Sequence, residues 1–173
     1  MSKPSKTARR LADLPPDAAI IGWREWVRMP GLDIRAIKAK IDTGARSSSI
    51  HAYDIETYAA QNDVGETDAN KSARRVRFKV HPIQRNESFE VQCDAPVADI
   101  RSVRSSNGQT DERIVIETPI YWNAMQWTIE LTLAPRFEMG FRMLLGREAV
   151  RGRFLVDSGA SYFGPKPKRR KKT

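Results

Sequence analysis

Short runs in which apolar and polar residues alternate constrain the fold of this chain more than any other feature of its sequence. Ile37, Ala39 and Ile41 share one face of such a run, and Lys38 and Lys40 share the other. This period of two is typical of a half-buried strand. Further strands are predicted over residues 20–29, 76–80, 89–92, 114–122, 127–133 and 154–156. Because these strands are short and closely spaced, we expect a mainly β fold, either a small barrel or a sandwich.

Two short helices are also predicted. One covers residues 54–60, within the mostly polar stretch that follows Tyr53. The other lies near the C-terminus and covers Arg147 to Arg151. Gly152 follows it at the position where a left-handed residue commonly ends a helix.

The basic residues are concentrated at the two ends of the chain. The formal net charge is +9, but residues 1–10 hold four basic residues and residues 165–173 hold six, with no acid in either stretch. The rest of the chain carries 20 basic and 21 acidic residues. We therefore expect a mobile basic arm at 1–17, one domain at 18–164 and a disordered basic tail at 165–173.

This charge distribution argues against a nucleic-acid-binding fold built around a basic face. The tail segment 166–172 remains a candidate for salt-sensitive contact with a polyanion such as RNA or the ribosome. The longest apolar stretches are about four residues, far below the roughly 20 that span a bilayer, so no membrane association is expected. Cys93 is the single cysteine. Without an intrachain disulfide, a reducing, cytoplasmic location is expected.

The most informative motif is a carboxylate placed after an apolar strand and before a turn of small residues. Asp42, Thr43, Gly44 and Ala45 form this motif. Gly44 carries no side chain that would keep another backbone or a substrate away from the carboxylate. Asp-Thr-Gly also occurs in ordinary turns, in which the aspartate caps its own backbone. The motif alone therefore leaves both interpretations open.

A second segment about a hundred residues later makes the first more specific. Leu144, Leu145 and Gly146 precede Arg147, where the short helix is predicted to begin. Together the two segments resemble those of the retropepsins, the retroviral type of aspartic protease. Residues 24–27, 103–108, 112–116 and 136–139 further resemble a bacterial branch, the retropepsin-like family associated with the glutamate ligase RimK and long labelled an ATP-dependent zinc protease family. The resemblance covers residues 22–162.

The resemblance implies a closed acid-protease barrel with one short C-terminal helix. It also implies an aspartic endopeptidase that works as a homodimer, because each subunit supplies one Asp42 to the catalytic pair. Thr43 would brace the opposite turn, and Gly44 and Ala45 would line the bound peptide. The apolar residues of the second segment, with Gly146, would support the turn from below. No cofactor is implied.

Arg46 departs from the retroviral pattern, which commonly has an acidic residue at this position that can pair with the later arginine. Arg46 and Arg147 would repel each other, so Arg147 needs another acid. Glu148 or Asp54 of either chain of the dimer, or an acidic substrate, could provide it. A guanidinium near the catalytic pair also favours ionised carboxylates, which argues against an acidic pH optimum.

Arg104 and Arg113 flank a turn-like stretch rich in hydroxyl groups. This stretch is either a solvated hairpin tip or a substrate-facing flap. In the second case the two guanidinium groups would hold carboxylates, as Arg46 and Arg147 would. The association with glutamate ligation suggests acidic or glutamylated protein substrates.

Two further groups of residues are candidates for alternative sites. His51, His81 and Cys93 lack the spacing of a metal site, so we expect no zinc. Asp157, before Ser158 and Gly159, imitates a second catalytic motif, but only thirteen residues remain after Ala160. Asp157 is therefore expected to end the final strand and cap a turn.

A different class of function stays open on these observations. The chain could be a non-catalytic β-module that binds peptides or acidic chains, with its tails contacting RNA or the ribosome. Such a module would be inert toward varied peptides.

Overall fold

The computed structural model describes residues 19–59, 74–104, 110–135 and 140–165. Residues 1–17 of the expected arm and all but the first residue of the expected tail lie outside these ranges. The strands within them are β1 (Ala19–Gly22), β2 (Arg24–Met29), β3 (Ile34–Asp42), β4 (Ser48–His51), β5 (Tyr53–Ala59), β6 (Arg74–Val80), β7 (Val91–Pro96), β8 (Asp99–Arg104), β9 (Thr110–Trp122), β10 (Met125–Ala134), β11 (Met143–Gly146) and β12 (Phe154–Asp157). The helices are the 3₁₀ turn η2 (Pro30–Leu32) and α1 (Arg147–Val150).

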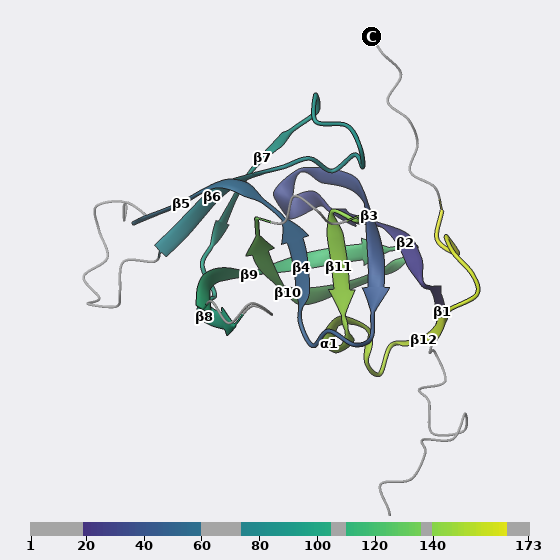
Figure 1. The fold of residues 1–173 in the computed structure, drawn as a ribbon. Coiled ribbons are helices and arrows are strands. Elements are labelled where there is room, and N and C mark those ends of the chain that lie inside the picture. The colour runs from purple at the N-terminus through teal and green to yellow at the C-terminus, as the bar shows by residue number, and fades with distance from the viewer. Residues whose placement is uncertain (1–18, 60–73, 105–109, 136–139, 166–173) are drawn as a thin grey trace, which may run out of the picture.

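Six of the strands pair in a closed ring. The order around it is β10, β4, β11, β3, β2 and β9, and β9 pairs again with β10 (Figure 1). β8 joins the outside of this ring by pairing with β9. The predicted mainly β fold with a short C-terminal helix is confirmed.

The connection between β3 and β4 determines the architecture of the candidate site. These strands are joined by residues 43–47, yet they do not pair with each other. β11 lies between them, parallel to β3 and antiparallel to β4. A strand from late in the sequence therefore holds both arms of the loop that follows Asp42.

β5, β6 and β7 form a separate antiparallel sheet that extends from one side of the ring (Figure 1). The prediction of a helix over residues 54–60 is wrong, because Tyr53–Ala59 forms strand β5. Non-local pairing with β6 stabilises this segment as a strand. On the outer face of the sheet, the Asp94 carboxylate accepts hydrogen bonds from Tyr58 and Arg75.

The C-terminal half follows the sequence prediction closely. β9 and β10 form a long antiparallel hairpin, with Asn123 at the turn in the left-handed region (φ 52°). The predicted helix is α1, and Gly152 has a φ of +76° in the turn that follows it. Of the helical segments in the described ranges, neither has the length and apolar character needed to cross a membrane.

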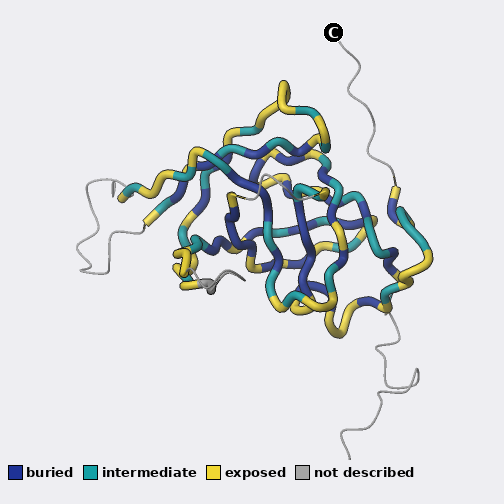
Figure 2. The backbone as a smooth tube through the Cα atoms, in the orientation of Figure 1, coloured by how far each residue is buried: buried dark blue, intermediate teal, exposed yellow. Residues whose placement is uncertain are grey.

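The buried residues are concentrated along the strands of the ring, with further ones on the outlying sheet (Figure 2). Alternating residues of β3 and β10 point into this core, as their period of two predicts. Trp122 and Trp127 are buried, and both rings contact Phe154 of β12. The core therefore links the long hairpin to the C-terminal strand.

A buried carboxylate fixes the segment that follows β12. Glu25 of β2 has no exposed surface. One of its oxygens accepts hydrogen bonds from the backbone N–H groups of Gly22 and Phe163, each at 2.9 Å. The other accepts from Trp122 Nε1 and from the N–H of Gly164, each at 3.1 Å. Four donors thus satisfy this charge, and the C-terminal segment is held against β2.

Candidate functional site

Asp42 is the last residue of β3, and its carboxylate organises the loop that follows. Its Oδ1 atom accepts hydrogen bonds from the N–H groups of Gly44 and Ala45, each at 3.1 Å. Asp42 is half-buried, whereas Thr43 and Gly44 are exposed. The two bonds fix the orientation of the carboxyl group, and the exposed residues leave this end of the loop open to a ligand or a second chain.

Gly146 brings β11 close beneath this loop. A Cβ atom at Gly146 would lie 2.4 Å from the carbonyl oxygen of Ser47 and 2.8 Å from that of Arg46. Both contacts are to backbone, which cannot move aside as a flexible side chain can. The crossing of the two segments therefore requires glycine at this position.

Hydrogen bonds between the loop and the start of α1 complete the crossing. The N–H of Gly146 donates to Ser48 Oγ at 3.1 Å. The N–H of Arg147 donates to the carbonyl of Ala45 at 2.8 Å, and that of Glu148 donates to the carbonyl of Arg46 at 3.1 Å. Leu144 and Leu145 are buried below. The Asp42 loop is therefore held by a rigid strand and helix.

The two arginines that were expected to repel each other have different partners. The guanidinium of Arg147 donates to the carbonyl of Thr43 at 3.3 Å, and Arg46 lies 4.0 Å from Glu148. Glu148 is also paired with Arg151 at 2.9 Å. Within one chain neither acid considered for Arg147 is its partner, because Glu148 pairs with Arg151 and Asp54 pairs with Lys79. Arg147 instead braces the loop after Asp42 by its hydrogen bond to the Thr43 carbonyl. Pairing with either acid of a second subunit stays a prediction.

Asp157 forms a similar turn, and Gly22 of β1 lies opposite it in parallel register, where a Cβ atom would be 2.6 Å from the carbonyl oxygen of Ala160. Asp157 is the last residue of β12, and its Oδ1 accepts a 2.8 Å hydrogen bond from the N–H of Gly159. It is exposed, and β12 pairs only with β1 within the described ranges. The expectation that Asp157 ends the last strand and caps a turn is confirmed.

Arg104 and Arg113 lie on the hairpin formed by β8 and β9. Arg104 pairs in register with Thr110, and Arg113 with Arg101. The tip between them, residues 105–109, lies outside the described residues, as does the side chain of Arg104. Nearer the ring, Arg101 shares a pocket with Arg46. The base of the hairpin is thus brought beside the Asp42 loop through Arg101, which the sequence did not single out.

The three residues considered as metal ligands lie apart from the Asp42 loop. His51 and His81 lie on either side of Tyr53, with ring centroids 6.3 and 4.7 Å from the tyrosine ring. Burial lowers the pKa of His51. Cys93 is buried on β7, and burial raises the pKa of its thiol to about 12. In the described part of the chain, no cluster of three or more His, Cys, Asp or Glu residues could hold a metal.

Two residues with clear structural roles were missed by the sequence analysis. Glu25 shares a face of β2 with buried Val27 and Met29, so its place in the alternation marked it as core-facing. Ser48 is buried below the loop, but nothing in a run of three serines distinguishes it from Ser47 or Ser49.

Comparison with protein-family models finds a match over residues 20–167 to the family described as RimB-like, retropepsin-like aspartic endopeptidase RimB. The chain is 46% identical over 138 residues to a probable alpha-L-glutamate ligase of Desulfotalea psychrophila, with 80% of the chain and 28% of that protein covered. It is 43% identical over 143 residues to a protein of the same description in Parasynechococcus marenigrum, with 83% and 28% covered. The chain thus spans less than a third of the length of these relatives.

A solved structure shares the fold. It is a Legionella pneumophila protein of unknown function, 23% identical, with a TM-score of 0.65 over 84% of this chain and 97% of the other. This likeness extends the architecture described above to a second protein and carries no information about activity.

Proposed function

The chain belongs to the RimB-like family of retropepsin-like aspartic endopeptidases, and from that premise we propose that it hydrolyses peptide bonds as a homodimer, with Asp42 of each subunit forming the catalytic pair. The observation that carries the proposal is the braced loop. It combines an oriented carboxylate at a strand end, a glycine crossing beneath it and an exposed Thr43-Gly44 tip. Such preorganisation is what a catalytic group needs.

The chemistry follows from the pairing of two identical carboxyl groups. Two carboxylates a few ångströms apart cannot both ionise at low cost, so the pair shares one proton. The ionised member removes a proton from water, and the protonated member donates a hydrogen bond to the scissile carbonyl. Oδ1 of Asp42 is held by the Gly44 and Ala45 N–H groups, which leaves Oδ2 to face the water.

The need for a second subunit is supported by the difference between Asp42 and Asp157. Asp42 is half-buried and its Oδ1 accepts two loop N–H bonds, whereas Asp157 is exposed and its Oδ1 accepts one within the described ranges. A glycine lies opposite each aspartate in register, Gly146 at Asp42 and Gly22 at Asp157. Thr43 is exposed at the tip, where its hydroxyl can reach the same turn of a partner subunit. Gly44 and Ala45 would line the peptide.

Acidic or glutamylated protein chains are the proposed substrates. The support is the name of the relatives, probable alpha-L-glutamate ligase, and the basic groups near the loop. Arg46 and Arg147 flank the loop, and Arg104 and Arg113 lie on the neighbouring hairpin. Replacing Arg104 with alanine is expected to reduce the preference for acidic over neutral peptides, and an unchanged preference would contradict this assignment.

We further propose a cytoplasmic setting, because a single cysteine suits a reducing compartment. Polyanion contact through residues 166–172 is part of the same proposal. Removing residues 165–173 should abolish any such contact and leave the fold intact.

The decisive experiment is Asp42→Asn. Asparagine keeps an Oδ1 acceptor for the two loop N–H groups, so folding and dimerisation are expected to survive. Peptide hydrolysis should fall by roughly a thousandfold or more, because the variant cannot supply the shared-proton pair. Asp157→Asn is the matched control and should retain activity. Equal activity of Asp42→Asn and wild type would refute the mechanism.

A second candidate function is a non-catalytic module that binds peptides or acidic chains. The observation that favours it is that the matching segment makes up only 28% of the ligase-named relatives, as one part of a larger protein. A monomer that binds acidic peptides but cleaves none of a varied set would favour this alternative.

A further inference from the structure

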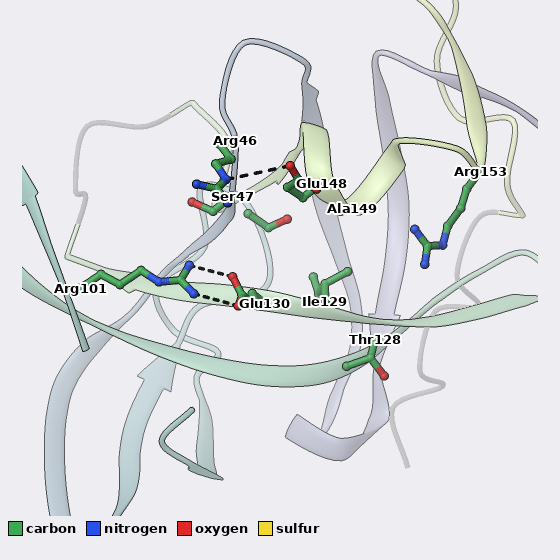
Figure 3. Close-up of a pocket in the computed structure, with 10 residues that line it drawn as sticks. Arg46, Ser47, Arg101, Thr128, Ile129, Glu130, Glu148, Ala149 and Arg153 are labelled. Carbon is green, nitrogen blue, oxygen red and sulfur yellow. Dashed lines mark hydrogen bonds and ion pairs between the residues drawn. The ribbon is translucent and has the colours of Figure 1, made fainter. Parts of the chain in front are cut away.

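A pocket of about 600 Å³ lies against Arg46 and Ser47 of the Asp42 loop (Figure 3). It is formed where the loop, α1 and β10 meet, and the Asp42 carboxyl group is not part of its lining. The lining residues are Arg46, Ser47, Ser48, Arg101, Thr128, Ile129, Glu130, Glu148, Ala149 and Arg153. Three of them are arginines, and two are glutamates.

The charges at one wall of the pocket are already matched. Arg101 binds Glu130 with two parallel hydrogen bonds of 2.7 and 2.8 Å, and its Nε donates to Asp99 at 2.7 Å. These bonds with Arg101 hold the pKa of Glu130 below its ordinary value. This wall of the pocket is therefore rigid. Because the guanidinium of Arg101 is already paired with two carboxylates, it offers little positive charge to a ligand.

The other two arginines are less completely matched. The side chain of Arg46 is 83% exposed, and its Nε atom lies 4.0 Å from Oε1 of Glu148, which is too far for a hydrogen bond. Glu148 has a closer partner in Arg151, at 2.9 Å. Arg153 is exposed, and none of the described residues pairs with its guanidinium. In Figure 3, Arg46 and Arg153 lie on either side of Glu148 and Ala149.

We propose that this pocket is a binding site for a small polyanion whose carboxylate or phosphate groups are held by Arg153 and Arg46. A planar guanidinium donates two parallel hydrogen bonds to such groups. The hydroxyl groups of Ser47 and Thr128 line the same space and can donate further hydrogen bonds. The two glutamates of the lining are paired with Arg101 and Arg151, which reduces their repulsion of an anion.

This site is separate from the proposed catalytic pair and requires neither Asp42 nor a second subunit. Ser47 and Arg46 nevertheless belong to the same loop as Asp42, and β11 passes directly beneath them. An anion in the pocket would therefore contact residues 46–48, at the end of the loop that begins after Asp42.

The test is an NMR titration of the full chain with citrate, pyrophosphate and acetate. Citrate and pyrophosphate distinguish carboxylate from phosphate as the preferred group, and acetate tests the need for several charges. Saturable shifts are expected at the amides of Ser47, Thr128 and Arg153. Arg153→Ala and Arg46→Ala should each weaken binding of the better probe by about fivefold or more, since each removes charge-assisted hydrogen bonds.

Arg35→Ala is the matched control, because Arg35 is an exposed arginine of β3 outside the pocket. It should change binding by less than about twofold. Asp42→Asn should bind as wild type does, so the site can stand even if the proposed peptidase activity fails. Equal weakening by Arg35→Ala would mean that general surface charge binds the anion, and this would overturn the site. Absence of saturable binding of either multivalent probe would overturn it as well.

Discussion

Gly146 lies opposite Asp42 in the parallel pairing of β11 with β3. The residue that ends the first strand of the site is thus matched in register with the residue that ends the strand beneath the loop. The N–H of Gly146 reaches on to Ser48 Oγ, 98 residues earlier in the chain. Three separate strands, β3, β4 and β11, therefore converge at one point.

Gly146→Ala should destabilise the protein and displace the Asp42 loop. The added methyl group would meet the Ser47 carbonyl oxygen at 2.4 Å. We expect a loss of about 3 kcal/mol in the free energy of unfolding, measured by chemical denaturation. Gly31→Ala is the control, because a Cβ there meets nothing within 4 Å. A Gly146→Ala variant as stable as the control would show that the crossing is looser than described.

Ser48→Ala should weaken the same crossing without adding bulk. The buried N–H of Gly146 would lose its acceptor, which costs about 1–3 kcal/mol. Hydrogen exchange at the Gly146 amide should accelerate accordingly. Ser49→Ala, at a half-buried neighbouring position, is expected to change stability by less than 1 kcal/mol, to order of magnitude. Unchanged exchange at Gly146 in Ser48→Ala would contradict the assigned bond.

Glu25→Gln should loosen the C-terminal segment. Glutamine offers one acceptor oxygen where the carboxylate offers two, and its NH₂ group would face two N–H donors. We expect a loss of about 2–4 kcal/mol, with faster amide exchange at Phe163 and Gly164. Glu117→Gln, at an exposed position of β9, should leave both measurements unchanged. Protection of Gly164 equal to that in wild type would exclude this role for Glu25.

Asp94 should contribute a pH-dependent part of the stability. Burial acts to raise the pKa of Asp94, but hydrogen bonds from Tyr58 and Arg75 outweigh it, so the pKa lies below its ordinary 3.8. A depressed pKa stabilises the folded state above pH 3.8, and that contribution disappears as pH falls through the lower folded value.

The measurement is urea denaturation of wild type and Asp94→Asn from pH 5 down to pH 2. The stability gap between them should be widest near pH 5 and should narrow toward pH 2. Glu56→Gln, an exposed position on the same sheet, should run parallel to wild type. A gap that stays constant with pH would mean that Asp94 titrates alike in the folded and unfolded chains.

Cys93 should be unreactive in the folded protein. Burial raises the pKa of its thiol to about 12, and only 2% of the residue is exposed. At pH 8 a thiol-specific disulfide reagent should react about a hundredfold or more slowly than after denaturation, because the thiolate is the reacting species. Rapid, stoichiometric labelling without denaturant would place the thiol at the surface.

The sequence predicted those parts of the structure that depend on local pattern or on a specific motif. Strand β3 and the β9–β10 hairpin follow from alternation, and α1 follows from its position before Gly152. The Asp42 turn could be located because its motif occurs together with the Leu144-Leu145-Gly146 segment about a hundred residues later.

The sequence failed where distant partners decide the outcome. β5 has a weak pattern of its own and becomes a strand because β6 pairs with it. The four donors around Glu25 come from segments as far apart as Gly22, Trp122 and Gly164, so no local sequence pattern predicts these hydrogen bonds. Arg147 uses the Thr43 carbonyl, which sequence reasoning about charges alone does not consider.

The position of β11 between β3 and β4 has a consequence for how the protein folds during its synthesis. Until Met143 and the residues after it have emerged during synthesis, β3 and β4 each present an unpaired edge to their surroundings. Such long-range pairing forms slowly, because a large stretch of chain must close before the contact is made. A nascent or truncated chain that ends before β11 therefore lacks the brace of the Asp42 loop, and this loop reaches its final form only after nearly the whole domain has been synthesised.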